Sequence, residues 1–287
     1  MYLASILGYG DSLITLSLLE RAGRAASNVC VVGTAVTRAT ADLMHGPPPI
    51  AEELFADVAA FYVIKQRGIA AALHDLLRFR RWAQDRLSPA DTLVLEKRDP
   101  RTRWLVPKGA CTVVEVTRGK SVYIDRETVL RPYIGEQHWQ PCARPWRRGE
   151  RLLINPSARA SSKNLPTKLV EASLQVAAAI GTKVCLIDVA GHYEALRTHV
   201  DRYLRSPSLR DAALALRESD RYLGPDSFFV HLAYYYRVPF LAFFRATDTY
   251  FAPPGTSEQG NYVYYPDAVN EEHFRGKLHW FLSGEKA

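Results

Sequence analysis

The segment Gly224–Phe244 combines a helix start with a buried strand, an arrangement that suits the binding of an anion. Asp226 and Ser227 are favoured helix-capping residues, and the apolar run after them has a roughly helical period that Pro239 ends. Phe240–Phe244 then predicts a fully buried strand. Free N–H groups at a helix N-terminus beside a parallel strand bind phosphate or pyrophosphate, so this segment points to nucleotide chemistry.

A polar loop between residues 155 and 166 is the second candidate for phosphate binding. It follows a predicted strand at Leu152–Asn155 and precedes a predicted helix from about Pro166 to Ile180. Its cations and hydroxyl donors suit phosphate oxygens, although an ordinary polar loop would look the same. These side chains are Arg159, Ser161, Ser162 and Lys163.

Asp11 lies just after a strand predicted at Tyr2–Leu7, where α/β folds place their sites. The turn Gly8–Gly10 leads into a helix predicted from about Ser12 to Ala22. Position 13 is Leu where a dinucleotide fingerprint has a glycine, so we expect neither NAD nor FAD here. Asp11 is therefore either a site residue or only a helix cap, and the sequence leaves both interpretations open.

His231 lies five residues after Asp226, within the same helix start. It can contact a phosphate or a sugar hydroxyl, or it can pack in the wall between two domains, and neither interpretation is favoured. The neighbouring Tyr234–Tyr236 are interpreted as packing residues.

Strand-length apolar runs alternate with helical patterns almost throughout, which predicts a parallel α/β architecture. The segment Gln140–Glu150 is rich in Pro, Arg and Gly, and we place a boundary between domains 1–145 and 146–287 there. In the second half, the further elements follow this alternation. We predict a strand at Lys183–Asp188 and helices near Tyr193–Leu204, Leu209–Arg217 and Glu271–Leu282.

The bulk composition is that of an ordinary globular protein: 287 residues, of which 47% are hydrophobic and 23% charged. We expect no transmembrane helix and no signal peptide, because the apolar runs are only of strand length and the N-terminus leads directly into a predicted strand. We also expect no structural metal, because the four cysteines and eight histidines show no ligand spacing. The net charge of +7 lies mostly in the first half, whose longest amphipathic helix, Ile69–Leu87, carries an arginine cluster. Arg78, Arg80 and Arg81 suit an anionic lipid, glycan or nucleic acid, or form a solvated helix face; no nucleic-acid-binding motif accompanies them.

The order of these motifs resembles the heptosyltransferase-like glycosyltransferases of family 9, which build the lipopolysaccharide inner core. The resemblance covers Gly8–Glu20 and most of residues 151–260. It implies a GT-B fold, α/β, with two Rossmann-like domains facing across a cleft. Residues 1–145 would bind the acceptor and residues 146–287 the nucleotide sugar, with a final helix that can pack back on the N-terminal domain.

Carried over by position, the resemblance implies a role for each candidate residue. Asp11 would be the general base, with Gly10 and the arginines 78, 80 and 81 on the acceptor side. The donor diphosphate would meet Arg159, Ser161, Ser162, Lys163 and Ser227. Asp226, Phe228 and His231 would line the donor sugar and nucleotide site. Phe228 departs from the family, which usually has glycine there, and its ring would narrow or reshape the donor pocket.

The resemblance implies an inverting, metal-independent glycosyltransferase that needs no cofactor and uses a nucleotide-diphosphate sugar as co-substrate. The acceptor would be a glycan or glycolipid hydroxyl in bacterial surface polysaccharide or lipopolysaccharide synthesis. We expect a cytoplasmic protein with peripheral contact to the inner face of the membrane and no nucleic-acid partner. Two alternatives stay open: a nucleotide-sugar epimerase or hydrolase of the same fold, and a non-catalytic module that binds a glycan or nucleotide, which Phe228 supports.

Overall fold

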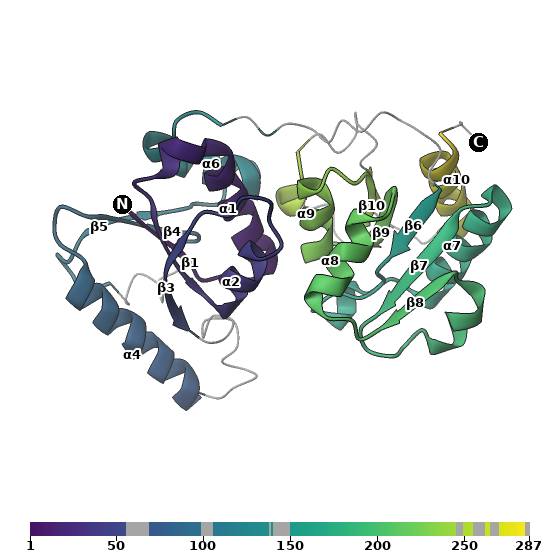
Figure 1. Ribbon diagram of the computed structural model, residues 1–287, viewed down its shortest axis with the longest axis horizontal. Helices are drawn as coiled ribbons and strands as arrows, with labels where there is room; N and C mark the ends of the chain where they lie inside the picture. Colours follow the sequence, from purple (N-terminus) through teal and green to yellow (C-terminus); the bar gives the residue numbers. More distant parts are fainter. Residues whose placement is uncertain are drawn as a thin grey trace. The chain divides into compact units, whose positions relative to one another are not determined.

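The computed structural model describes residues 1–55, 69–98, 106–137, 139, 150–244, 249–254, 262–264 and 270–284. The chain divides into two compact units, Met1–Trp139 and Gln140–Ala287. Each unit contains a parallel sheet with helices packed against it (Figure 1). The predicted boundary after residue 145 lies outside the described residues and stays a prediction.

The N-terminal unit is built on a five-stranded parallel sheet of order β3-β2-β1-β4-β5. Its strands are short, and the three central ones, β2, β1 and β4, are mostly buried, as expected for a parallel sheet. They are β1 (Tyr2–Ser5), β2 (Cys30–Thr34), β3 (Ile50–Phe55), β4 (Thr92–Leu95) and β5 (Thr112–Glu115). Because β1 and β4 are parallel neighbours, with Tyr2 paired to Leu93, the residues that follow them meet at the same edge of the sheet.

Helices of the N-terminal unit form two groups. The first group contains α1, which contacts both α2 and α6, and the second contains α4, whose Phe79 and Trp82 join the core formed by Ala4 and Leu93. Their bounds are α1 (Tyr9–Ala22), η1 (Gly23–Ala26), α2 (Ala35–Ala41), α4 (Ile69–Arg86) and α6 (Val122–Ile134). Ser121 caps α6 by accepting a bond from the Ile124 N–H at 3.2 Å.

The C-terminal unit has a six-stranded parallel sheet of order β11-β10-β9-β6-β7-β8. Its two central strands, β6 and β9, end beside each other, which brings the loop after β6 next to the residues after β9. The strands are β6 (Arg151–Ile154), β7 (Lys183–Asp188), β8 (Arg202–Arg205), β9 (Arg221–Pro225), β10 (Phe240–Phe243) and β11 (Tyr262–Tyr264).

The final helix packs inside the C-terminal unit. Phe274 and Leu278 share a buried core with Leu169 of α7, and the Arg275 guanidinium donates to Gln175 at 2.5 Å. The helix that was expected to be able to pack back on the N-terminal domain thus lies on α7. The helices of this unit are η2 (Ser161–Lys163), α7 (Thr167–Ile180), η3 (Glu194–His199), α8 (Leu209–Arg217), α9 (Phe228–Tyr235), η4 (Thr249–Phe251) and α10 (Glu271–Ser283).

The helix predicted near Tyr193–Leu204 is correct only in its first half, where it is a short 3-10 helix. The chain forms the short helix η3 and then the edge strand β8, whose Arg202 pairs with Cys185. The apolar side chains recur at helical spacing, but they reach one core from a turn, the short helix η3, a loop and a strand. These side chains are Tyr193, Leu196, Val200 and Tyr203.

Gly224 and Pro225 end strand β9. Gly224 is needed in this strand because a Cβ atom there would lie 2.8 Å from the Asn155 carbonyl oxygen. The sequence prediction of helix α9 is correct, with Ser227 as its N-cap and a start at Phe228. Among the described residues, none of the helices is long and apolar enough to cross a membrane.

Candidate functional site

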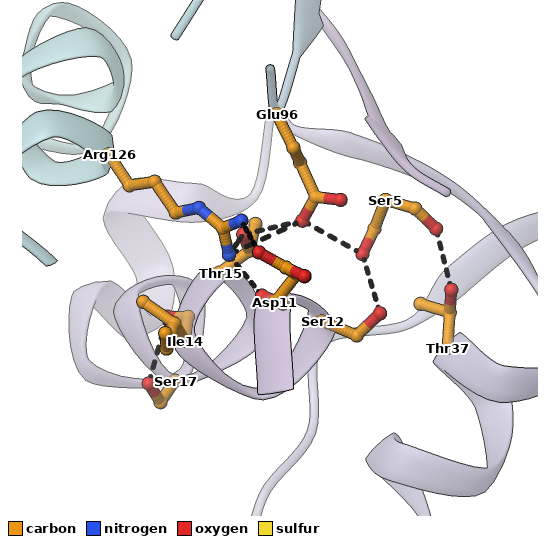
Figure 2. A network of polar contacts seen from close by, with 9 residues as sticks. All are labelled: Ser5, Asp11, Ser12, Ile14, Thr15, Ser17, Thr37, Glu96 and Arg126. Atoms are coloured by element: carbon orange, nitrogen blue, oxygen red, sulfur yellow. Dashed lines mark hydrogen bonds and ion pairs between the residues drawn. The ribbon is translucent and has the colours of Figure 1, made fainter. Parts of the chain in front are cut away.

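Asp11 belongs to the first turn of α1, which begins at Tyr9 rather than near Ser12 as predicted. Gly8 is the N-cap, so the interpretation of Asp11 as a helix cap is wrong. The carboxylate instead pairs with Arg126 of α6, whose Nη2 lies 2.5 Å from Asp11 Oδ1 (Figure 2). Arg126 Nη1 also donates to the Asp11 main-chain carbonyl. The Asp11 side chain remains 31% exposed.

Behind Asp11, a second carboxyl group completes a buried polar cluster (Figure 2). Glu96 follows β4, and its Oε1 accepts from Thr15 Oγ1 at 2.6 Å and from Ser5 Oγ at 3.1 Å. Thr15 in turn accepts from Arg126 Nη1 at 2.9 Å. The cluster therefore links β1, α1, β4 and α6 around Asp11.

Glu96 is almost closed to solvent: its side chain is 1% exposed, and that of Arg126 is 2% exposed. Burial raises the pKa of the Glu96 carboxyl, the positive charge of Arg126 opposes the rise, and the negative charge of Asp11 adds to it. Within the described part of the chain, Glu96 Oε2 and Arg126 Nε have no hydrogen-bond partner. Burial, a perturbed pKa and polar atoms without partners are more typical of functional sites than of surface ion pairs.

The sequence analysis missed Glu96 and Arg126. A signal for Glu96 was present, because it directly follows the short apolar run Thr92–Leu95, as Asp11 follows the first strand after a turn. No local signal existed for Arg126, which comes from a helix that was not predicted and lies 115 residues from Asp11 in sequence.

In the C-terminal unit, the structure brings together Lys163 and Asp226, as the sequence analysis had grouped them. Lys163 Nζ lies 2.6 Å from Asp226 Oδ2. The loop that carries Lys163 is fixed by amide side chains, because Asn164 Oδ1 accepts from the Ala158 N–H at 2.8 Å and Asn155 Oδ1 from the Ser157 N–H at 3.2 Å. The lysine side chain is 45% exposed and that of Asp226 15%, so the cation faces solvent.

The start of α9 lies next to this pair. Asp226 N donates to Phe243 O at 2.9 Å, which holds the chain beside β10 just before the helix begins. The Ser227 hydroxyl makes no capping bond to α9, so it leaves the N–H groups of the first turn to other acceptors. An anion placed here would meet these N–H groups together with Lys163.

The remaining candidates of the donor side differ in their exposure. Arg159, Ser161 and Ser162 are exposed on the same loop as Lys163. Phe228 is half-buried, and its ring lies edge-on to Phe229 at 5.6 Å between centroids. His231 is only 7% exposed, which favours its interpretation as a packing residue.

The arginines predicted for the acceptor side lie on α4. Arg78 and Arg81 are exposed and Arg80 is half-buried, while Phe79 and Trp82 of the same helix pack into the core. This amphipathic arrangement presents a cationic surface, as the sequence predicted. Gly10 lies in the first turn of α1 beside Asp11.

Asp188, at the end of β7, is a further buried carboxylate that the sequence analysis missed. Its oxygens accept from the N–H groups of His192 and Tyr193 at 3.0 and 2.8 Å and from the Tyr203 hydroxyl at 2.6 Å. Burial by itself would raise the pKa of Asp188, but these bonds outweigh burial and lower it. Asp188 thus fixes the loop that follows β7.

In the described ranges, no group of three or more His, Cys, Asp or Glu side chains is placed to hold a metal ion.

Comparison with known proteins gives a clear result for the fold alone. No protein-family model matches the chain, and no curated protein sequence matches it significantly. Among solved structures, it is similar to E. coli heptosyltransferase WaaC with ADP, with TM-score 0.67 and 15% identity over 98% of this chain and 99% of that one.

Two further solved structures agree. WaaC with ADP-2-deoxy-2-fluoro heptose has a TM-score of 0.64 and 16% identity, covering 92% of both chains. A glycosyl transferase of family 9 from Veillonella parvula DSM 2008 has a TM-score of 0.64 and 14% identity, covering 92% of this chain and 85% of that one. The predicted fold class, two Rossmann-like α/β units of the kind found in these glycosyltransferases, is confirmed.

Proposed function

We propose that this chain is a glycosyltransferase that moves a sugar from a nucleotide-diphosphate donor to a hydroxyl group of a glycan or glycolipid. The observation that carries the proposal is that each unit bears a charged group at the carboxyl ends of its strands: Asp11 in one and Lys163 with Asp226 in the other. A base and a cationic phosphate site are the two groups that glycosyl transfer needs. The fold supports the proposal, since its solved relatives in fold include heptosyltransferases.

In the proposed reaction, Asp11 takes the proton of the acceptor hydroxyl while that oxygen attacks the anomeric carbon. The new bond forms on the face opposite the leaving group, so the configuration inverts. The bond between the anomeric carbon and the phosphate oxygen breaks, and its electron pair leaves with the nucleotide diphosphate. This reaction requires that the donor held by the C-terminal unit reaches Asp11. The cleft that the resemblance implies is therefore part of what we propose.

The leaving diphosphate would be stabilised by fixed positive charge. Lys163 and Arg159 supply cations, Ser161 and Ser162 neutral donors, and the first turn of α9 after Ser227 supplies N–H groups. These groups take the place that a divalent ion would have, so we propose a metal-independent reaction without a cofactor. Its donor would be a nucleotide-diphosphate sugar, a class to which the ADP-2-deoxy-2-fluoro heptose of the WaaC structure also belongs.

Asp226, Phe228 and His231 are proposed to shape the sugar and nucleotide site. When Lys163 binds a phosphate oxygen instead of Asp226, the Asp226 carboxylate can accept a hydrogen bond from a sugar hydroxyl. The half-buried Phe228 ring lies where the resembled family has glycine, and it would restrict the donor that fits.

The acceptor is proposed to be anionic, because Arg78, Arg80 and Arg81 give α4 a cationic surface. A phosphorylated or carboxylated glycolipid of the bacterial surface, such as a lipopolysaccharide precursor, fits this charge. The same surface would attract the protein to the inner face of the cytoplasmic membrane as a peripheral enzyme.

A non-catalytic nucleotide- or glycan-binding module is the second candidate, and Phe228 is the observation that favours it, since the ring could close the donor pocket. A thermal-shift screen with nucleotide diphosphates and nucleotide sugars separates the two. A ligand that binds only the folded state raises its stability by about 2.7 kcal/mol at 100 times Kd. Stabilisation followed by transfer to a glycan acceptor supports the enzyme; binding without transfer or hydrolysis supports the module; no stabilisation by any nucleotide overturns the donor site.

A further inference from the structure

The cluster around Asp11 contains two carboxyl groups but a single guanidinium. Arg126 Nη2 lies 2.5 Å from Asp11 Oδ1, and Arg126 Nη1 lies 3.8 Å from Glu96 Oε1. Among the described residues, these three are one another's only ion-pair partners within 4.0 Å; the other groups in contact are the neutral hydroxyls of Ser5 and Thr15. The proton balance of the cluster is therefore set by Asp11 and Glu96 around one fixed cation.

Their charges act on each other through a medium that screens them poorly. Glu96 and Arg126 are almost fully buried, and water reaches only Asp11. The negative charge of Asp11 contributes to the raised pKa of Glu96, after burial and against the effect of Arg126. An electrostatic interaction between two sites is mutual, so the two carboxylates repel each other across the one guanidinium they share.

A base that pairs with an arginine faces a difficulty. When Asp11 takes up a proton, its negative charge disappears, and Arg126 would be left as a buried cation without a counter-ion, which is costly. Glu96 removes the difficulty, because its carboxylate already lies behind the same guanidinium and is joined to it through the Thr15 hydroxyl at 2.6 and 2.9 Å.

We propose that Glu96 is a positioning residue that holds Arg126 and strengthens Asp11 as the base, by supplying the counter-ion of Arg126 while Asp11 carries the proton. The inference rests on the proposed function for the reaction itself. With Glu96 ionised, the acceptor O–H bond breaks, its proton moves to Asp11, and the cluster passes from a net charge of −1 to neutral. Without the Glu96 charge the same step would leave a net charge of +1 in a buried site.

The first test is the pH dependence of transfer in Glu96→Gln, which removes the charge but keeps the shape. If Glu96 carries that charge during catalysis, its loss should move the acidic limb of the kcat/KM profile to lower pH. A weaker base transfers the proton more slowly, so kcat should fall by about tenfold while KM for the donor stays unchanged. Glu96→Asp, which keeps the charge, should restore the acidic limb to its wild-type position.

The matched control is Glu127→Gln. Glu127 lies next to Arg126 on α6 and is also largely buried, but it pairs with Arg131 at 3.4 Å rather than with the cluster. This control should leave the acidic limb in place. A merely structural Glu96 would lower activity without moving the limb, and that result would overturn the proposal.

The second test does not depend on turnover. Carbon-13 NMR of carboxyl groups follows Asp11 and Glu96 directly in the full chain, and in the wild type each resonance should show an inflection at the pH where the other titrates. In Glu96→Gln, the Asp11 resonance should lose this inflection, because the coupled carboxyl group is gone. If the wild type shows no mutual inflection, the role of Glu96 is overturned. This outcome does not depend on whether the variants fold. A wild type that shows the inflection but transfers no sugar refutes the proposed function instead.

Discussion

Lys163 Nζ lies 2.6 Å from Asp226 Oδ2, which ties the loop after β6 to the residue between β9 and α9 across 63 residues of sequence. The contact depends on the parallel pairing of β6 and β9, which ends both strands at one edge of the sheet. An exposed ion pair contributes only about 0–1 kcal/mol to stability, so this pair has little value as a structural link. The pair holds the Lys163 ammonium group where phosphate oxygens can replace Asp226 as its partner.

Replacement of this cation should weaken nucleotide binding. Lys163→Met should reduce the affinity for a nucleoside diphosphate by about 10–100-fold, because a hydrogen bond to a charged group is worth about 1.5–3 kcal/mol. Titration calorimetry with ADP, UDP and GDP measures the loss. Lys183→Met is the control, since Lys183 is an exposed lysine at the opposite, amino end of β7. Equal affinities of the two variants would contradict the assignment of Lys163.

Asp11→Asn should remove transfer and spare donor binding. The amide keeps the shape of the side chain but cannot accept the acceptor proton, and loss of a general base costs about 10²–10⁴-fold in rate. Initial rates of sugar transfer give kcat, and the thermal shift with donor reports binding. Asp42→Asn, at an exposed aspartate of the same unit, is the control. An Asp11→Asn variant with wild-type kcat would exclude Asp11 as the base.

Phe228→Ala should broaden the range of accepted donors. The ring is half-buried at the first helical position of α9, so its truncation opens space next to the proposed diphosphate site. We expect kcat/KM for bulkier donor sugars to rise relative to the preferred donor, measured by competition between nucleotide sugars. Phe229→Ala removes the same volume one residue further on, where the ring stacks on Tyr222. If both variants changed donor preference alike, Phe228 would have no special role.

Asp188→Asn should destabilise the C-terminal unit in a pH-dependent way. The folded-state pKa of Asp188 is lowered, so its ionised form stabilises the fold above the unfolded pKa, and this contribution is lost as pH falls through the folded pKa. At pH 7 the variant should unfold with a free energy lower by about 1–3 kcal/mol. Urea unfolding at pH 7 and in acid measures the difference, which should shrink in acid. A pH-independent difference would contradict the role of the charge.

Two glycine substitutions should have opposite effects on stability. In Gly224→Ala the new Cβ would lie 2.8 Å from the Asn155 carbonyl oxygen, so the loop after β6 must move, at a cost of about 1–3 kcal/mol. In Gly276→Ala, inside α10, the Cβ meets no atom within 4 Å, and higher helix propensity should stabilise by about 0.5–1 kcal/mol. Thermal unfolding of both variants checks the signs, and a stabilising Gly224→Ala would show that this backbone approach is not tight.

Local pattern alone predicted much of the fold. Strand β7 at Lys183–Asp188 and helix α8 at Leu209–Arg217 were predicted with their observed bounds, because one is a short apolar run and the other has a helical period and the N-cap Ser208. The same reasoning failed for the second half of Tyr193–Leu204, where the helical spacing continues from η3 into a loop and an edge strand that share one core. The spacing of apolar residues indicates which side chains are buried. Whether a helix, a loop or a strand carries them depends on how the chain pairs with the sheet.

For the site, the sequence by itself determined the types and the order of the reactive residues: a carboxylate after the first strand, a lysine in the loop after β6, and an acidic–hydroxyl pair before α9. Only the tertiary structure decided that Arg126 holds Asp11 and that Glu96 lies behind both. Their ionisation depends on burial and on distances of a few ångströms between groups as far apart as 115 residues in sequence. Such distances follow from strand pairing and helix packing, and no local pattern contains them.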